Sequence, residues 1–329
     1  MLNIFYEEPD PDRWIKFDRY PRKLIRRVIR GKDRPGGVMM VALGLMAGLD
    51  KLNVPYRFND FSYIKKNPNE LACVIGKPQV LEKIGVNSPI LFGAGVFSHP
   101  IDDLNLLIRY PNIRKILLPG DWMRDMFNPY YPNMVESWPV GIDTDKWQIN
   151  ELSNKNKILI YYKIRWDNEL INSTLFDPIK SFFENSQLEY DVIKYGHYSP
   201  NELFEKLRSS SSVIFLCEHE TQGIAYQQIL SCNIPIFAWD RGGHWSDPSY
   251  FPTIKYSPVS SVPYWDNRCG DKFKNFEEFK SKWQLFQKSV ANNFYSPRDY
   301  IQENLSLEIS TKQYLSIVKK IGFENSYNS

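Results

Sequence analysis

Cysteine is scarce in this sequence of 329 residues, and its spacing is irregular. The four cysteines are Cys73, Cys217, Cys232 and Cys269. None belongs to a C-x-x-C pair, and the four histidines show no metal-ligand spacing with one another or with cysteine. The sequence therefore predicts buried free thiols in a reducing compartment, with neither a disulfide framework nor a metal site.

Long apolar runs and a strong excess of one charge are also missing. The longest apolar stretch, Val38 to Leu49, is shorter than a membrane span of ~20 residues. No basic segment followed by an apolar run opens the chain, so we expect no signal peptide. A formal net charge of +3 is too small to indicate a nucleic-acid partner. We therefore predict a cytoplasmic protein that does not bind nucleic acid.

Three familiar active-site motifs are absent: the Gly-x-Ser-x-Gly elbow, the Walker A loop and a complete Gly-x-Gly-x-x-Gly fingerprint. The composition is that of an ordinary globular protein, with 43% hydrophobic and 24% charged residues. The chain is long enough for two domains.

Helical patterns alternate with short apolar runs along the chain. The expected strands are 2–6, 54–58, 71–75, 90–92, 116–118, 138–142, 158–162, 190–195, 213–217 and 234–239. The expected helices are 38–52, 121–127, 175–184, 199–207 after a capping box, 224–232 and most of the chain from 276 onward. This alternation predicts an α/β fold with parallel, doubly wound sheets, and the polar segment 151–157 reads as a linker between two domains.

The stretch 213–243 is the most informative part of the sequence. A buried strand leads into an acidic loop with Glu218 and Glu220, and Gly223 allows a close turn into a helix that begins at Ile224. A second strand then ends at Gly242 and Gly243. Open α/β sheets bind ligands at the carboxyl ends of their strands, so this edge is suited to hydroxyl and phosphate groups.

The same stretch resembles the retaining GT-B glycosyltransferases of family 4 (glycosyl transferases group 1). Glu220, Gly223, Gln228 and Pro235 fall on that family's pattern, and Gly242-Gly243 match its later glycines. Gln228 replaces the usual second glutamate, and Asn233 replaces a glycine. Weaker resemblance covers 139–147, a segment leaving the first domain, and 34–37, a glycine loop before a helix.

The resemblance implies two doubly wound Rossmann-like domains facing a cleft. The acceptor-side domain would be 1–150 and the nucleotide-sugar domain 151–295, with the helices of 296–329 crossing back to the first domain. It also implies transfer of a hexose from a nucleotide diphosphate sugar to an acceptor hydroxyl, with retention. The acceptor would be a glycan, a lipid-linked molecule or a small molecule. No metal or further cofactor is expected.

Roles of single residues follow from the same resemblance. Glu220 would contact the donor sugar, and Gln228 the ribose. The diphosphate would be held by Lys163 and Arg165, by the helix N-terminus at Gly223 and Ile224, and by Gly242-Gly243. From the first domain, His99 would lie near the donor sugar, and Gly36 and Gly37 would contribute a glycine loop.

Each of these residues also has a simpler interpretation. The simpler reading of Glu220 is an exposed loop acid, with Glu218 as a neighbouring ion-pair partner. Lys163 and Arg165 read as surface charges at a strand end, and His99 as a local hydrogen-bonding group. Gln228 reads as a helix-surface residue, with Gln227 as the true counterpart of the family's glutamate.

Three further segments leave alternatives open. Asp143-Thr-Asp145 matches a short metal signature but fits a segment between domains better. Residues 261–270 are rich in turns and aromatics and read as a loop over the base or the acceptor. The basic residues of 13–34 indicate either a solvated helix or a peripheral contact with anionic lipid at the inner membrane surface, or with a phosphorylated acceptor.

Other functions remain possible at this stage. A nucleotide-sugar epimerase would share the fold, and a catalytically silent nucleotide-sugar-binding protein would fit the loss of glutamate at Gln228. A nucleic-acid-binding module is the least supported, because no reader motif is present.

Overall fold

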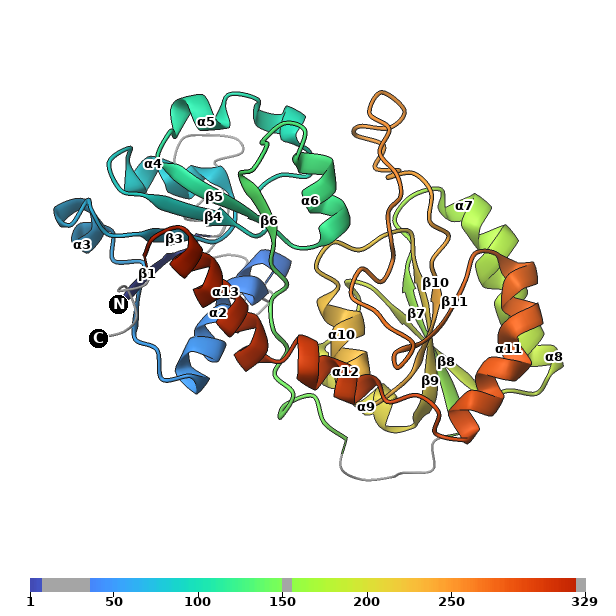
Figure 1. The fold of residues 1–329 in the computed structure, drawn as a ribbon. Helices are drawn as coiled ribbons and strands as arrows, with labels where there is room; N and C mark the ends of the chain where they lie inside the picture. The colour runs from blue at the N-terminus through green and yellow to red at the C-terminus, as the bar shows by residue number, and fades with distance from the viewer. Residues whose placement is uncertain (8–35, 150–155, 324–329) are drawn as a thin grey trace, which may run out of the picture. The chain divides into compact units, whose positions relative to one another are not determined.

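The computed structural model describes residues 1–7, 36–149 and 156–323. These residues form two compact units, each built on its own parallel sheet (Figure 1). The first unit contains Met1–Pro119, Phe127–Val140 and Ser310–Ser329. The second contains Gly120–Met126 and Gly141–Ile309. The basic segment predicted at 13–34, with its membrane or acceptor contact, and most of the predicted linker lie outside the described residues.

The sheet of the first unit has the strand order β2-β1-β3-β4-β5-β6. Its strands are β1 (Leu2–Phe5), β2 (Tyr56–Phe58), β3 (Ala72–Val74), β4 (Ile90–Gly93), β5 (Ile113–Leu118) and β6 (Val135–Ser137). Its helices are α2 (Gly37–Lys51), α3 (Phe61–Lys66), α4 (Leu81–Ile84), α5 (Leu106–Arg109) and most of α13 (Leu307–Lys320), with short turns η1 (Pro78–Val80) and η2 (Pro100–Asp103). The described strands pair in parallel throughout.

The sheet of the second unit has the order β11-β10-β9-β7-β8. Its strands are β7 (Lys157–Lys163), β8 (Tyr190–Lys194), β9 (Ser210–Cys217), β10 (Ile236–Trp239) and β11 (Gly270–Phe273). Its helices are most of α6 (Asp121–Phe127), then α7 (Asn168–Ile171), η3 (Asn172–Phe176), α8 (Asp177–Asn185), α9 (Pro200–Arg208), α10 (Ile224–Ser231), α11 (Phe276–Ala291) and α12 (Pro297–Asn304).

Helices cover both faces of the second sheet (Figure 1). On one face, side chains of α9, α10 and α12 form a core with inward residues of the strands. On the other face, α8 and α11 form a second core around Phe237, whose ring stacks 4.8 Å from that of Phe286. Apolar side chains on both faces of a strand explain why these strands read as continuous apolar runs in the sequence.

Most of the expected elements are confirmed, including the capping box of α9. There Ser199 accepts from the Glu202 N–H, and the Glu202 carboxylate accepts from the Ser199 N–H. Asn233, expected in the left-handed region after α10, has φ +58°. The helix expected at 175–184 begins earlier, because α7 and η3 precede α8 without a break.

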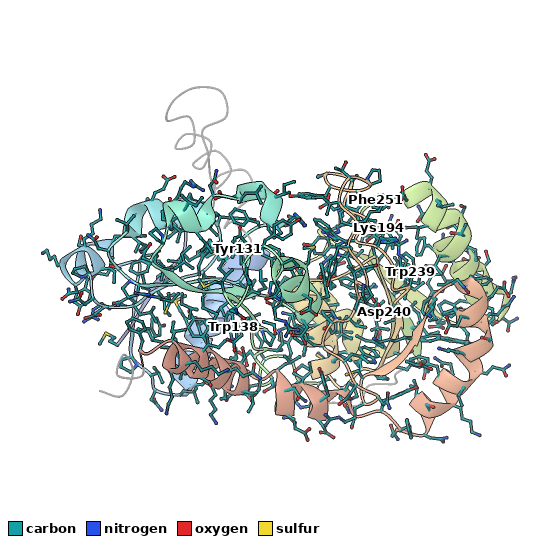
Figure 2. All side chains as sticks on the ribbon, turned by 45° about the horizontal axis from the view of Figure 1, so that its top comes forward. Tyr131, Trp138, Lys194, Trp239, Asp240 and Phe251 are labelled. Atoms are coloured by element: carbon teal, nitrogen blue, oxygen red, sulfur yellow. The ribbon has the colours of Figure 1, made fainter. Side chains whose placement is uncertain are left out.

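One strand expectation was wrong, and one strand was missed. The last strand of the first unit is β6 rather than 138–142, because the chain leaves the sheet at Pro139, which has no N–H to donate. Trp138, labelled in Figure 2, instead packs 4.8 Å from the Tyr314 ring, and its indole donates to the Ser310 carbonyl. The polar strand β11 was missed, because its sequence Gly-Asp-Lys-Phe carries no strand pattern.

The observed units differ from the domain ranges expected from the sequence. Residues 141–149 belong to the second unit, whereas the expected first domain extended to residue 150. The tail 296–329 is also divided, with α12 in the second unit and residues 310–329 in the first. Arg298 of α12 explains part of this division, because its guanidinium donates to the carbonyls of Thr144, Trp147 and Ser231.

Candidate functional site

The candidate site of the second unit lies where its strand order reverses. Strand β7 is the first of the sheet, and it lies between β8 and β9. The register pairs Lys163 at the end of β7 with Cys217 at the end of β9. Ligands of open α/β sheets bind outside the carboxyl ends of strands at such a switch point. The residues that follow Lys163 and Cys217 therefore occupy the expected ligand-binding edge.

Lys163 and Glu220 form a buried ion pair at this edge. The Lys163 Nζ donates to Oε1 of Glu220, and the two side chains are 11% and 6% exposed. Burial would lower the pKa of Lys163, but the nearby Glu220, with Cys217, raises the pKa above its ordinary value. Lys163 is therefore positively charged, and its charge is paired with that of Glu220. The interpretations of Glu220 as an exposed acid and of Lys163 as a surface charge are both wrong.

The backbone of Glu220 is held as firmly as its side chain. Its N–H donates to the Ser260 carbonyl at 2.9 Å, and its carbonyl accepts from the Trp122 indole N–H at 2.7 Å. Both partners come from segments distant in sequence. The carboxylate is therefore fixed in position at the end of β9 without depending on a ligand.

Glu218 orders the loop that follows β7. Its Oε1 accepts from the backbone N–H groups of Arg165 and Trp166, at 2.7 and 2.9 Å. Within the described ranges it forms no ion pair, so its expected role as an ion-pair partner was wrong. The Arg165 side chain is exposed, and its guanidinium lies 4.3 Å from the centre of the Trp166 ring. Glu218 thus positions Arg165 through the backbone.

His219 is a member of this cluster that sequence reasoning missed. It is 3% exposed, and its ring lies 5.7 Å from that of Trp122 and 5.2 Å from that of Trp166. Neither ring nitrogen has a hydrogen-bond partner among the residues that the structure describes. Burial, and then the charges of Arg165, Lys163 and Arg241, lower the pKa of His219 to about 3. The signal that the sequence offered for His219 was its position between Glu218 and Glu220, in a loop that follows a strand. The spacing of the histidines matched no motif.

Gly223 allows the chain to enter α10. Its φ is +66°, and a Cβ at this position would lie 2.0 Å from the Tyr226 ring. Ile224 is the first residue of the helix and is half-buried. Gln227 is fully buried, and its side-chain amide donates to the Gln222 carbonyl at 2.7 Å, which ties α10 to the loop before it. Gln228 is half-buried on the same helix.

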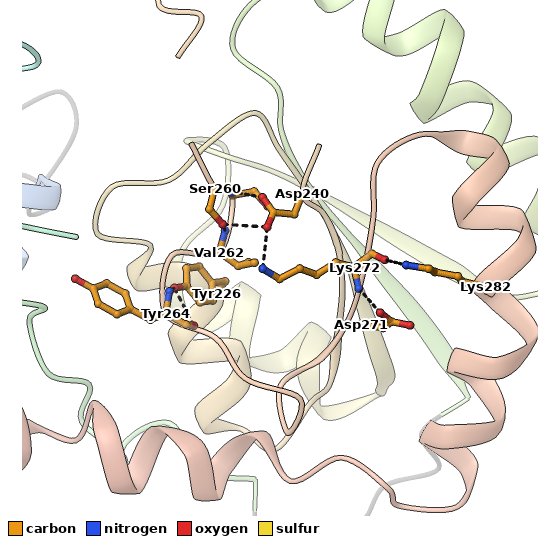
Figure 3. Close-up of polar contacts among 9 residues, drawn as sticks. Tyr226, Asp240, Ser260, Val262, Tyr264, Asp271, Lys272 and Lys282 are labelled. Atoms are coloured by element: carbon orange, nitrogen blue, oxygen red, sulfur yellow. Dashed lines mark hydrogen bonds and ion pairs between the residues drawn. The ribbon is translucent and has the colours of Figure 1, made fainter. Parts of the chain in front are cut away.

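Asp240 ties the loop after β10 back to the sheet (Figure 3). Its carboxylate accepts from Ser260 Oγ at 3.0 Å, from the Ser261 N–H at 2.9 Å and from Lys272 Nζ at 2.8 Å. Ser260 is also the residue whose carbonyl holds the Glu220 N–H. This network links the ends of β9, β10 and β11.

The glycines after β10 are open to solvent on one side. Gly242 and Gly243 have φ +64° and +88°, and nothing lies within 4 Å of a Cβ built on either. The loop expected at 261–270 is held against α10, since the Tyr226 hydroxyl accepts from the Tyr264 N–H at 3.0 Å (Figure 3). The structure thus brings Glu220, Lys163, Arg165 and Gly223 to one edge of the second sheet, with Gly242 and Gly243 after the neighbouring strand.

His99, Gly36 and Gly37 belong to the first unit. His99 is 2% exposed and caps η2, where its Nδ1 accepts from the Ile101 N–H at 3.2 Å. Burial lowers its pKa. Its local hydrogen-bonding role is therefore observed. Gly36 and Gly37 are exposed at the N-terminus of α2.

The structure also bears on the expectations about metals, cysteines and membrane spans. In the described ranges, no group of three or more His, Cys, Asp or Glu side chains is arranged to hold a metal ion. Asp143 instead closes a turn, because its Oδ1 accepts from the N–H groups of Asp145 and Lys146. The cysteines are buried and free, as predicted. None of the helices in the described part of the chain has the length and apolar character needed to span a membrane.

Solved structures resemble this chain, although no protein-family model and no curated protein matches it. The N-terminal domain of Candida albicans trehalose-6-phosphate phosphatase has a TM-score of 0.53 at 12% identity, over 94% of this chain and 82% of that one. The Gap123 glycosylation-associated protein complex of Streptococcus agalactiae gives 0.50 at 11%, over 81% and 56%. TarM gives 0.48 at 13%, over 88% and 58%, so this chain spans little more than half of TarM. At these identities the similarity concerns the fold alone, and the two parallel sheets with their alternating helices show that this chain has an α/β architecture.

Proposed function

We propose that this chain is a glycosyltransferase that moves a hexose from a nucleotide diphosphate sugar to an acceptor hydroxyl with retention. The observation that carries the proposal is the buried carboxylate of Glu220 at the switch point of the second sheet. A carboxylate that accepts one bond from Lys163 keeps further lone pairs for sugar hydroxyls. Because its backbone and side chain are already held, it is preorganised for that role.

The central experiment compares transfer by the wild type with transfer by Glu220→Gln, using a panel of nucleotide sugars and acceptors. Removing a charged hydrogen bond at the transition state lowers the rate by roughly two to three decades. Glu205→Gln is the matched control, because Glu205 is an exposed acid of α9 in the same unit and should leave transfer unchanged. Near wild-type transfer by Glu220→Gln would refute the proposed donor site.

The nucleotide is proposed to bind without a divalent metal, since cationic side chains at this edge supply the positive charge. Calorimetric titration with a nucleoside diphosphate, with and without a chelator, tests this point. Equal affinity in both conditions supports it, and complete loss of binding on chelation contradicts it.

A silent binding protein is the second candidate, and the substitution of glutamate by Gln228 favours it. An amide keeps an acceptor for ribose hydroxyls but lacks the charge that roughly doubles the strength of such bonds. Gln228→Glu should therefore change nucleotide affinity more than turnover. Nucleotide binding without transfer or donor hydrolysis would identify the silent protein, and a changed sugar without any acceptor would identify an epimerase.

A further inference from the structure

Arg241 lies on the same sheet edge as Arg165. The register pairs Trp239 of β10 with Leu216 of β9. Arg241 and Glu218 each lie two residues beyond this pair, so both follow the carboxyl ends of the paired strands. Arg165 follows β7 on the other side of β9, because the sheet order runs β10-β9-β7. Two arginines therefore flank the loop that carries His219 and Glu220.

Two lysines of this edge are already neutralised by carboxylates. Lys163 is paired with Glu220, and Lys272 is paired with Asp240 at 2.8 Å (Figure 3). The remaining carboxylate, Glu218, accepts from two backbone N–H groups. The charges of these two lysines are therefore balanced locally.

Neither arginine forms an ion pair with a carboxylate in the part of the chain that the structure describes. Arg165 lies over the Trp166 ring at 4.3 Å, and Arg241 lies over the Trp239 ring at 5.2 Å. Arg241 also donates one bond, from Nη2 to the Ser246 hydroxyl at 3.0 Å. Contact with an aromatic face fixes a guanidinium while leaving donors at its edge, and this fork geometry matches phosphate oxygens.

Polar groups without partners lie in the loop after β9, which the two arginines flank. The His219 ring nitrogens and the Gln222 side-chain amide have no hydrogen-bond partner among the described residues. Buried polar groups in native proteins are nearly always satisfied, and those that are not require an explanation. A bound anion with several oxygens supplies acceptors for the N–H groups of these side chains.

We propose that Arg165 and Arg241 together bind the diphosphate of the donor. In this proposal Arg241 has the diphosphate-binding role that the sequence resemblance implied for Lys163. The inference rests on the proposed function. It assigns Arg241 as a binding residue and Lys163 as a positioning residue for Glu220. The chemical reason is that a lysine charge already neutralised by a buried carboxylate attracts phosphate weakly.

The test is calorimetric titration of the full chain with UDP, GDP and ADP, and with inorganic pyrophosphate, at low and moderate salt. Arg165→Gln and Arg241→Gln should each weaken binding of the best diphosphate roughly ten- to a hundredfold. Arg241→Lys should restore part of the affinity, because it keeps the charge. Added salt should reduce the difference between variants and wild type.

Two controls separate anion binding from effects on the loop. Ser246→Ala removes the hydrogen bond of Arg241 but not its charge, and it should bind like the wild type. Arg208→Gln removes an arginine at the end of α9 and should also have no effect. Thermal unfolding of each variant verifies that the second unit is intact.

The outcomes distinguish the inference from the function on which it rests. Loss of binding in Arg241→Gln, with normal binding in both controls, supports the inference. Normal binding in Arg241→Gln overturns it while leaving the proposed function standing. Weakening in Ser246→Ala equal to that in Arg241→Gln also overturns it, because the loop then accounts for the effect. Absence of diphosphate binding by the wild type overturns the proposed function and this inference together.

Discussion

The buried pair Lys163–Glu220 predicts a large, non-additive effect on stability. Removing one partner from a buried pair leaves an uncompensated charge, which typically destabilises a protein by about 3–5 kcal/mol. The two side chains are 11% and 6% exposed, so solvent screens the remaining charge poorly. Lys163→Met should fall in that range. Adding Glu220→Gln to it removes both charges and should recover at least about 2 kcal/mol of the loss.

The assay is a double-mutant cycle measured by urea unfolding of the full chain, followed by tryptophan fluorescence and circular dichroism. The exposed pair Lys280–Glu277 of α11 is the matched control, since its side chains are 47% and 77% exposed. Its coupling energy should be about 0–1 kcal/mol. If the mutations at Lys163 and Glu220 were additive within about 0.5 kcal/mol, the buried pair would not exist as described.

The same pair predicts a direction for the pH dependence. The pKa of Lys163 is raised in the folded chain above its ordinary value of 10.5. Its stabilising contribution is therefore complete below pH 10.5 and is lost as pH rises through the folded pKa. Wild-type stability should accordingly decline above that pH more steeply than the stability of the Lys163→Met, Glu220→Gln double variant. Parallel decline of the two proteins would argue against the assignment.

Three further predictions concern single positions. The pKa of His219 is lowered to about 3, so stability should fall as pH drops below 6.5, by roughly 2 kcal/mol at pH 5, and His219→Phe should remove that slope in urea titrations. Gly270→Ala should destabilise by at least about 2 kcal/mol, because the new Cβ would lie 1.9 Å from the Ile236 carbonyl oxygen at φ +137°, whereas Gly37→Ala meets nothing within 4 Å and should be nearly neutral in thermal unfolding. Ser199→Ala removes the N-cap of α9 and should cost about 1 kcal/mol in the same assay.

Local chemistry determined much of the fold from the sequence alone. Apolar runs such as 213–217 specify strands buried on both faces, and residues with special backbone roles, such as Gly223 and Asn233, mark where helices begin and end. The capping box at Ser199 is likewise a local pattern. These features depend on neighbours in the chain, so reading the chain was sufficient to predict them.

Partners distant in sequence were decided by the tertiary structure. Lys163 and Glu220 are 57 residues apart in the sequence. The pairing of β7 with β9 brings them together, so that the Glu220 carboxylate neutralises the Lys163 charge. The burial of His219 between two tryptophans, and the position of Arg241 opposite Arg165, depend on the same sheet order. The sequence alone determined that acidic and basic residues follow these strands. The tertiary structure decided which charges cancel, because charge pairing depends on distance in space, and that distance is set by strand order and register.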